Sequence, residues 1–193
     1  MTRRVFVAIG VPTAVRDALA AATAGLRAPQ AALRATAPAG WHLTLAFLGD
    51  LEDEQQELAA VVTREVLARD APRPAPWLAL AAADRFGDRV LVVPVSEDPP
   101  GALAGLVARL REELTAVGFA LPEASFRPHV TLARARRNRP VTRADVAALT
   151  VPDRRWQPAT VGLWAAARAG GPRPYEVLAE LAWPAGPPPA GGD

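Results

Sequence analysis

Two parts of the chain repeat one order of elements, a predicted helix followed by a strand that carries a histidine. The histidines stand in W-H-L-T-L-A-F and P-H-V-T-L-A-R, so each has a threonine two residues later: His42 with Thr44, and His129 with Thr131. Strand pairs joined by short turns alternate with the helices along the chain. This mixture predicts an α+β fold with largely antiparallel sheets. The repetition predicts two similar lobes around one cleft.

Runs of β-branched and aromatic residues predict the strands, and apolar residues at helical spacing predict the helices. The strands are predicted at 5–9, 41–48, 77–83, 89–95, 126–132, 159–166 and 175–183, and the helices at 13–27, 50–66, 98–118 and 142–149. Polar residues supply the expected N-caps, which are Thr13, Asp50, Asp98 and Thr142. Pro99 and Pro100 follow Asp98 at the first helical positions, and Asp145 has the spacing of a capping box with Thr142. Gly118 is expected to end the third helix.

Length and composition limit the class of protein. The chain has 193 residues, which fits one domain, and we expect that domain to cover residues 1–183. Residues 184–193 are nearly all Pro, Gly and Ala and are expected to be a disordered tail. Cysteine is absent, which excludes disulfides and cysteine nucleophiles. We find no secretion signal and no apolar run of the about 18 residues that span a bilayer. We therefore expect a soluble, cytoplasmic protein, and a monomer.

Charge is informative only locally. All 22 basic residues are arginine, and the 20 acidic residues leave a net charge of +2. The densest basic cluster consists of Arg134, Arg136, Arg137, Arg139 and Arg143. It has two interpretations: a rim that attracts phosphate, or an incidental result of arginine use throughout an Ala-, Arg- and Pro-rich chain.

The duplicated H-x-T pattern is hard to attribute to chance. Only 11 of the 193 residues are threonine, so chance would place one two positions after both histidines about 0.3% of the time. Side chains at i and i+2 of a strand lie on one face, so each pattern offers an imidazole beside a hydroxyl. The other face of each strand carries apolar residues, which are Leu43, Leu45, Val130 and Leu132. The H-x-T faces can therefore line a groove.

Such a groove suits cleavage of a phosphodiester without a metal. The reaction needs a base that takes a proton from the nucleophile and an acid that protonates the leaving oxygen, and histidine titrates near neutral pH. The hydroxyls of Thr44 and Thr131 and a guanidinium can donate hydrogen bonds to the charged phosphoryl oxygens. The predicted guanidinium is that of Arg134, five residues after His129.

The histidines also have two less specific interpretations. A buried histidine is often a core residue whose ring nitrogens simply find partners, although a duplicated pair that can act as acid and base favours function. A metal site would have two neutral ligands at most, whereas catalytic zinc normally has three protein ligands. We predict no metal and no cofactor.

Five segments, two of which contain the H-x-T motifs, are spread over about residues 3–183: R-V-F-V-A-I, H-L-T-L-A-F-L-G, G-F, F-R-P-H-V-T-L-A-R and P-R-P-Y-E-V-L-A-E. Together they make the chain resemble a 2H phosphoesterase of the RNA 2',3'-cyclic phosphodiesterase branch, historically called 2'-5' RNA ligase. The resemblance implies a bilobal fold with pseudo-twofold symmetry, a central cleft and helices outside. It also implies metal-independent hydrolysis of a terminal 2',3'-cyclic phosphate to a 2'-phosphate, and in some members reversible 2'-5' joining of RNA ends.

The resemblance assigns roles to single residues. His42 would be the general acid that protonates the 3' oxygen, and His129 the general base that activates water. The phosphate would be held by Thr44, Thr131 and Arg134. Phe47 matches a family position that packs near the base, although strict alternation points it away from His42. A bulge or a strand end would be needed to turn the Phe47 side chain toward the groove. The alternative interpretation is that Phe47 is an aromatic residue of the core.

Three functions fit these residues. The first is hydrolysis of a cyclic phosphate on an RNA end or in a small cyclic nucleotide. The second is 2'-5' joining of RNA ends as the physiological direction, because microscopic reversibility lets one site do both. The third is a module that binds RNA ends without turnover, and the intact histidine pair argues against it.

Overall fold

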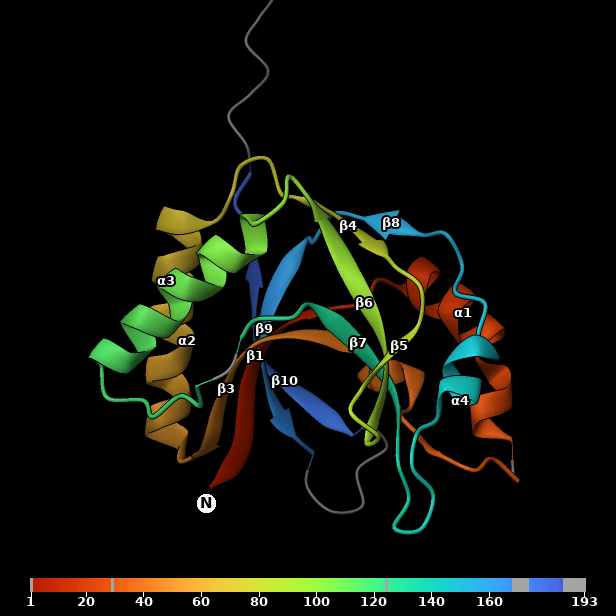
Figure 1. Ribbon diagram of the computed structural model, residues 1–193. Coiled ribbons are helices and arrows are strands. Elements are labelled where there is room, and N and C mark those ends of the chain that lie inside the picture. Colours follow the sequence, from red (N-terminus) through yellow and green to blue (C-terminus); the bar gives the residue numbers. More distant parts are fainter. Residues whose placement is uncertain (1, 29, 124, 168–173, 186–193) are drawn as a thin grey trace, which may run out of the picture.

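The computed structural model describes residues 2–28, 30–123, 125–167 and 174–185 (Figure 1). One sheet has the order β10 (Tyr175–Ala182), β9 (Thr160–Ala166), β1 (Arg3–Gly10) and β3 (His42–Leu51). The other has the order β2 (Arg34–Ala35), β7 (His129–Arg134), β6 (Val90–Asp98), β4 (Trp77–Leu80) and β8 (Arg155–Trp156), and β5 (Asp84–Phe86) also pairs with β6. All of these pairings are antiparallel, which confirms the predicted α+β architecture.

The first sheet is organised around β1. Residues 5–9 of this strand are all buried, so β1 is covered on both faces, as its continuous apolar run requires. β3 pairs with one edge of β1 and β9 with the other. The strand that carries His42 is thus fixed directly to the most buried strand of this sheet.

The second sheet holds the other histidine strand. β6 lies at its centre and pairs with β7 on one side, while β4 and β5 pair with successive parts of its other edge. β5 forms a hairpin with β6, and Gly87 in its turn has a φ of +57°. The predicted strand over 77–83 ends at Leu80, and residues 84–86, which lie between the predicted strands, form a strand of their own. β3 and β7 belong to different sheets but contact each other. The two H-x-T motifs therefore meet where the sheets meet.

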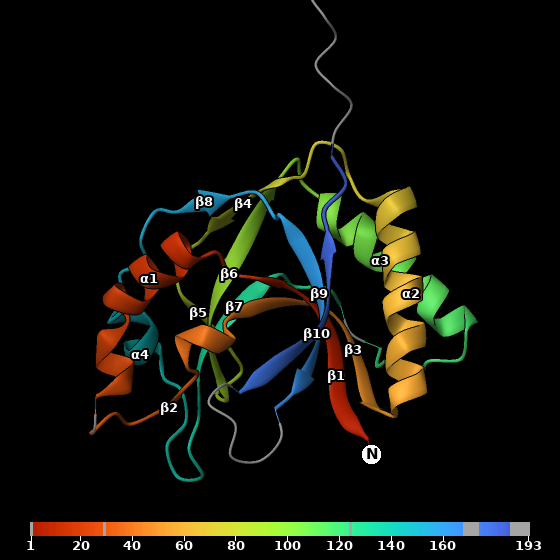
Figure 2. The same ribbon diagram turned by 180° about the vertical axis from the view of Figure 1, so that it is seen from behind.

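The helices lie outside the sheets in two groups. α2 (Asp53–Asp70) packs against α3 (Ala102–Ala116) on one side of the molecule, and α1 (Thr13–Ala22) and α4 (Arg143–Ala147) both lie on the opposite side (Figures 1 and 2). The inner face of α3 is a stripe of buried residues at helical spacing, namely Leu103, Leu106, Val107, Leu110 and Leu114. Burial of each such side chain stabilises the fold by about 1.5–3 kcal/mol. The core cluster takes residues from both sheets and from α1, α2 and α3.

Two helices begin later than predicted because the preceding strand is longer. Asp50 belongs to β3, where its backbone pairs with Arg4, and the N-cap of α2 is Glu52. The side-chain oxygen of Gln55 accepts from the Glu52 amide at 3.0 Å and completes a capping box. Asp98 likewise ends β6, so it does not cap α3.

Glycine and proline are the N-caps of α3 and α1. Gly101 caps α3 with a φ of +83°, a left-handed conformation that favours glycine. Thr13 is the first residue of α1 and Pro12 precedes it as the N-cap, so the prediction of Thr13 as the cap is wrong. α1 also ends at Ala22, and a 3-10 turn over Ala24–Arg27 replaces the last predicted helical turn.

Two predicted helix ends are confirmed. The Thr142 hydroxyl accepts from the amide of Asp145 at 3.2 Å, and the Asp145 carboxylate accepts from the amide of Thr142 at 2.7 Å. Gly118 follows α3 with a φ of +99°, which stops the helix. Residues 186–193 of the predicted tail lie outside the described ranges. Within those ranges, no helix is both long and apolar enough to cross a bilayer.

Candidate active site

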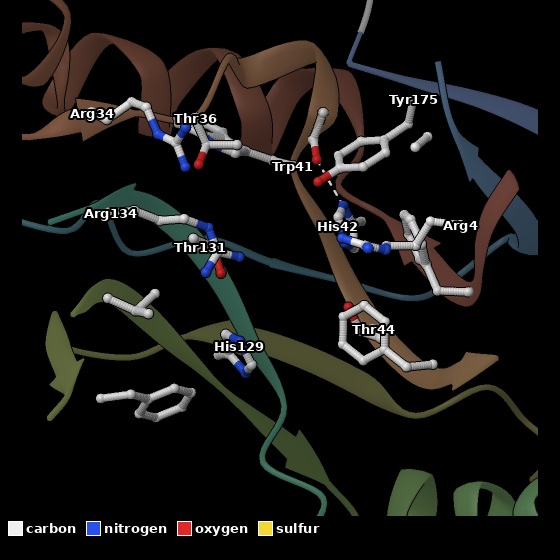
Figure 3. Close-up of a pocket in the computed structure, with 16 residues that line it drawn as sticks. Arg4, Arg34, Thr36, Trp41, His42, Thr44, His129, Thr131, Arg134 and Tyr175 are labelled. Atoms are coloured by element: carbon white, nitrogen blue, oxygen red, sulfur yellow. Dashed lines mark hydrogen bonds between the residues drawn. The ribbon is translucent and has the colours of Figure 1, made fainter. Parts of the chain in front are cut away.

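A cavity of about 560 Å³ is lined by residues of both sheets (Figure 3). β3 and β7 form its middle, β1 and β10 contribute from the first sheet, and β2 and β5 contribute from the second. The structure brings all of the predicted site residues to this one cavity: His42, Thr44, Phe47, His129, Thr131 and Arg134. The two similar motifs therefore form one site.

Each histidine is held by a carbonyl two residues earlier in the chain. His42 Nδ1 lies 2.7 Å from the Gly40 oxygen, and His129 Nδ1 lies 2.6 Å from the Arg127 oxygen. A carbonyl oxygen can only accept, so each Nδ1 must carry the hydrogen. Each ring therefore keeps Nε2 for a ligand, as acceptor when neutral and as donor when protonated. The same local arrangement in both lobes fixes the same tautomer twice.

Aromatic rings surround His42. Phe6 stacks on it, with ring centroids 4.7 Å apart and 27° between the planes, and the Tyr175 ring meets it edge-on at 5.2 Å. The Trp164 ring lies 5.5 Å away at a tilt of 42°. Such a surround restricts the ring to one orientation and removes water from its faces.

These surroundings control the protonation of both histidines. Burial lowers the pKa of His42 from 6.5 to about 4, and the positive charges of His129 and Arg134 add to the shift, while the Gly40 carbonyl opposes it. Burial also lowers the pKa of His129, with Arg134 acting in the same direction and the Arg127 carbonyl opposing. Both rings are therefore mostly neutral at pH 7 without a ligand. An anion bound beside them would favour the imidazolium form.

A bulge in β3 places Phe47 in the cavity. The register of β3 with β1 shifts between Thr44 and Ala46, which leaves Leu45 as the bulged residue. The alternation of side chains resumes one residue later, so Phe47 comes back to the face of Thr44. Its side chain is 48% exposed, and its ring centroid lies 5.8 Å from that of Phe6. The interpretation of Phe47 as a core aromatic is wrong.

An arginine that we did not predict faces Arg134. Arg34 lies in the two-residue strand β2, where it pairs directly with Arg134 of β7, and both line the cavity with Arg4 (Figure 3). Like charges directly opposite on neighbouring strands repel each other. No carboxylate is among the described residues that line this cavity. This arrangement suits an anionic ligand that lies between the two guanidinium groups.

Sequence reasoning also missed the aromatic walls. Phe6, Tyr175 and Phe86 reach the cavity from β1, β10 and β5. Tyr175 is the only tyrosine of the chain, and that rarity is the one sequence signal that singles it out. Phe6 lies in a run of core residues, and Phe86 lies between two predicted strands, so neither stands out by pattern.

The arginines of the predicted basic cluster do not lie together in the structure. Of its members, Arg134 lines the cavity. Arg139 forms a bidentate ion pair with Asp145, at 2.7 and 3.0 Å, and Arg143 lies at a different hollow. The cluster is therefore not one phosphate-attracting rim. Among the residues that the structure describes, no group of three or more His, Cys, Asp or Glu side chains is placed to hold a metal ion.

Comparisons with known proteins agree with this geometry. A family model described as the 2'-5' RNA ligase superfamily matches residues 12–170. The chain is 35% identical over 98 residues to the RNA 2',3'-cyclic phosphodiesterase of Geobacillus stearothermophilus, across 49% of this chain and 30% of that protein. It is 30% identical over 132 residues to the RNA 2',3'-cyclic phosphodiesterase of Escherichia coli K12, across 68% of this chain and 72% of that protein. The chain thus spans about a third of the length of the first relative and nearly three quarters of the second.

Solved structures show the same architecture. The crystal structure of E. coli LigT complexed with 3'-AMP superimposes with a TM-score of 0.74 at 26% identity, covering 94% of this chain and 98% of that one. The crystal structure of TT0787 of Thermus thermophilus also gives a TM-score of 0.74, at 24% identity, covering 93% and 97% of the two chains. The bilobal two-sheet fold implied by the sequence resemblance is therefore confirmed.

Proposed function

The chain belongs to the 2'-5' RNA ligase superfamily, and on this basis we propose that it is an RNA 2',3'-cyclic phosphodiesterase that works without a metal ion. One observation carries the proposal. His42 and His129 line the same cavity, and a backbone carbonyl holds Nδ1 of each ring, so that both present Nε2. Two imidazoles in this arrangement supply a general acid and a general base. A module that only binds RNA ends needs no such pair.

The reaction divides between the two rings. Nε2 of His129 accepts a proton from water as the water oxygen bonds to phosphorus. The bond between phosphorus and the 3' oxygen breaks, and Nε2 of His42 donates its proton to that oxygen. The bond to the 2' oxygen is kept, so the product carries a 2'-phosphate and a 3'-hydroxyl. Because His42 must be protonated to act as the acid, the bound phosphate anion has to raise its lowered pKa first.

Hydrogen-bond donors compensate the charge of the phosphoryl group. Thr44 and Thr131 follow the two histidines on the same strand faces and line the same cavity. Arg134 and Arg34 face each other at the end where β2 pairs with β7. Donors fixed at the oxygens stabilise the transition state, in which negative charge grows, more than the ground state.

The proposed substrate is an RNA end or a small nucleotide that carries a 2',3'-cyclic phosphate. The cavity volume of about 560 Å³ lies in the range of about 300–1,000 Å³ that small-molecule sites have. Phe47 and Tyr175 offer apolar ring faces beside the histidines, and bases stack on such faces. Both curated relatives are named RNA 2',3'-cyclic phosphodiesterase, which supports this substrate class.

The test uses purified protein and a short RNA that ends in a 2',3'-cyclic phosphate. We expect a product with a 2'-phosphate, identified against 2'- and 3'-phosphate standards, and the same rate in excess EDTA. His42→Ala and His129→Ala should each lower the rate about a hundredfold or more. A 3'-phosphate product would contradict the assigned leaving oxygen. Loss of activity in EDTA that a divalent ion restores would contradict the two-histidine mechanism.

A further inference from the structure

Arg34 and Thr36 line one end of the cavity that holds the two histidines. They are two residues apart along an extended segment that begins with β2, so their side chains lie on the same face of it. The Thr36 amide donates to the Leu132 carbonyl at 2.8 Å, which continues the contact with β7 beyond the end of β2. Figure 3 shows both residues at the end of the cavity that is opposite to Arg4. A guanidinium and a hydroxyl thus stand together there on a fixed backbone.

The positive charge at this end has no negative counterpart in the protein. Arg34 pairs directly with Arg134, and residues directly opposite on antiparallel strands have Cβ atoms about 4.5–5.5 Å apart. Among the residues that the structure describes, neither guanidinium forms an ion pair with a carboxylate. Both side chains are exposed, so water screens their repulsion in the free protein. A bound anion turns this repulsion into attraction, which favours a ligand that carries phosphate.

The two arginines are not equally close to the histidines. The positive charge of Arg134 lowers the pKa of both His42 and His129, whereas the charge of Arg34 is among the causes of neither shift. Because the interaction between two charges weakens with distance, Arg134 lies nearer to the rings than Arg34 does. In the proposed reaction the cyclic phosphate lies between the rings, on the side of Arg134. Arg34 is left for a second negative charge farther from the reacting centre.

We propose that Arg34 and Thr36 bind a second phosphate of the substrate, the one on the 5' oxygen of the nucleotide that carries the cyclic phosphate. In an RNA strand this group is the phosphodiester that leads to the preceding nucleotide, and in a mononucleotide it is a 5'-phosphate. The inference rests on the proposed function, because it takes the cyclic phosphate to lie between the two histidines. It makes the protein selective for substrates with two phosphates over a nucleoside 2',3'-cyclic phosphate, which has one.

The shape of a nucleotide supports this assignment. The base leaves the ribose at C1' and the 5' group leaves it at C4', and these two carbons flank the ring oxygen on opposite sides. A base that stacks on Tyr175 therefore directs the 5' group away from that ring. In Figure 3, Arg34 and Thr36 lie on the side of the cavity opposite to Tyr175. The second phosphate meets there a planar guanidinium, which can bind two of its oxygens, and a hydroxyl donor.

Arg4 also lines the cavity and offers a less suitable site for this phosphate. It lies on the same side as Tyr175 (Figure 3), and its Nε is 3.9 Å from a carboxylate oxygen of Asp50. That carboxylate competes with a phosphate for the guanidinium. Arg4 is therefore the matched control for Arg34, because it is an exposed arginine of the same cavity that has no part in the proposed subsite.

The experiment compares substrates that differ in the second phosphate. Adenosine 2',3'-cyclic phosphate lacks this group, and 5'-phosphoadenosine 2',3'-cyclic phosphate carries it as a monoester. The dinucleotide ApA with a 2',3'-cyclic phosphate end carries it as a phosphodiester. The methylphosphonate form of this dinucleotide has nearly the same size without the charge. We expect kcat/KM to be at least about tenfold higher for the phosphodiester than for the methylphosphonate, because only the phosphodiester gives Arg34 a charged acceptor.

The two charged substrates identify the source of the second phosphate. We expect both to have a higher kcat/KM than adenosine 2',3'-cyclic phosphate, since the subsite recognises the phosphate itself. A larger gain for the dinucleotide identifies an RNA strand as the source, and a larger gain for the monoester identifies a mononucleotide. Either order supports the subsite. A monoester that gains nothing contradicts it.

Matched variants locate the second phosphate. The readout is the ratio of kcat/KM for the phosphodiester to kcat/KM for the methylphosphonate. Arg34→Gln should lower this ratio about tenfold, and Thr36→Val about threefold, because a neutral hydroxyl donates a weaker hydrogen bond than a guanidinium. Arg4→Gln should leave the ratio at its wild-type value. So should Thr150→Val, at an exposed position outside the cavity.

The possible results separate this inference from the proposed function. A wild-type protein that hydrolyses none of the substrates overturns the proposed function, and the inference falls with it. Hydrolysis with equal kcat/KM for the phosphodiester and the methylphosphonate overturns the inference alone. So does an Arg34→Gln variant that keeps the wild-type ratio, because Arg34 then does not bind the second phosphate. A ratio that falls in Arg4→Gln instead places that phosphate at the opposite end. Partial unfolding lowers both rates alike, so it cannot imitate a lower ratio.

Discussion

At the scale of single residues, the site depends on two rings that are oriented alike but surrounded differently. Both donate Nδ1–H to a carbonyl two residues earlier. Phe6 and Tyr175 enclose His42, whereas Phe86 contacts only one side of His129. The pKa of His42 is lowered to about 4, and burial lowers that of His129 as well. In the proposed mechanism, the free protein therefore needs its substrate to complete the acid–base pair.

The pH dependence of the rate should show this need. The proposed mechanism requires one protonated and one neutral ring, so kcat/KM should be bell-shaped, with limbs set by the coupled pair in the free protein. Because both pKa values lie below the ordinary 6.5, we expect the optimum of kcat/KM below pH 6.5. In kcat the basic limb should lie at higher pH, since the bound phosphate favours the imidazolium. Steady-state kinetics across the pH range give the profiles of kcat/KM and of kcat. An optimum of kcat/KM above pH 7 would refute the assignment of the two histidines as the acid–base pair.

The phosphate donors should affect kcat without moving the pH optimum. Thr44→Val and Thr131→Val keep the shape and delete a donor, and Arg134→Lys keeps the charge but loses the planar fork. Each should lower kcat, on the order of a hundredfold for a lost transition-state donor. Thr150→Val and Arg136→Lys, at exposed positions outside the cavity, are the matched controls. If Arg134→Lys retains full activity, the phosphate lies elsewhere in the cavity.

The residues that could be predicted are those whose signal is local. His42 and Thr44 share a strand face because they are two residues apart, and the duplicated motif made the pair visible. Phe6 and Tyr175 touch His42 from strands that are far away in sequence. Arg34 owes its place to a pairing between β2 and β7 that spans 100 residues. The periodicity of a single sequence does not reveal contacts between residues that are so far apart in the chain.

At the scale of elements, the turn before β3 packs closely against the start of β10 at Gly40. A Cβ on this residue would lie 2.6 Å from Cγ of Pro174 and 3.3 Å from Cδ2 of Tyr175. The residue is buried, and its carbonyl is the acceptor for His42 Nδ1. Close approach of the start of β10 thus holds both the aromatic wall and the carbonyl that orients the histidine.

Gly40→Ala should therefore disturb the site as well as the packing. The new methyl group must push β10 and the turn before β3 apart, which moves the carbonyl that orients His42. We expect the free energy of unfolding to fall by about 1–3 kcal/mol and kcat to fall about tenfold or more. Gly25→Ala is the control, because nothing lies within 4 Å of a Cβ there. Urea denaturation and kcat of the two variants test this, and equal behaviour of the two would contradict it.

Element order was predictable, and several boundaries were not. The long apolar runs of β1 and β6 and the spaced leucines of α3 give strong periodic signals, and they appear where predicted. β2 and β8 have two residues each, too few for any periodicity. Asp50 has the side chain of a helix cap, but its backbone pairs with β1 instead. At Asp50, strand pairing with β1 therefore outweighs the preference of its side chain for a helix N-cap.

At the scale of the whole molecule, the site exists only where the two sheets meet. β3 of one sheet and β7 of the other each bring an imidazole and a hydroxyl, and neither of these strands alone carries both histidines. The repeated order of elements was enough to predict this junction. A second cavity of about 370 Å³ beside it was not predictable, because α3, β5 and the segment before β7 form its walls by packing rather than by pattern.

Burial of His42 at this junction couples global stability to pH. The pKa of His42 is about 4 in the folded protein, against an ordinary value of 6.5. Between these two values the unfolded chain binds the proton that the folded protein excludes, so the free energy of unfolding must fall as the pH drops from 6.5 toward 4. The full difference corresponds to at most about 3 kcal/mol, and partial exposure of the ring reduces it.

Comparison with a variant isolates this contribution. His42→Gln cannot titrate, so its free energy of unfolding should fall less than that of the wild-type protein over the same interval. Urea denaturation of both proteins at pH 7 and near pH 4 gives the fall in the free energy of unfolding for each. We expect this fall to be about 2 kcal/mol larger in the wild-type protein than in the variant. The comparison cancels the carboxylates that titrate in the same range, because both proteins share them. An equal fall in the two proteins would mean that His42 is already solvated in the folded state, and the aromatic surround would then not exclude water from the ring.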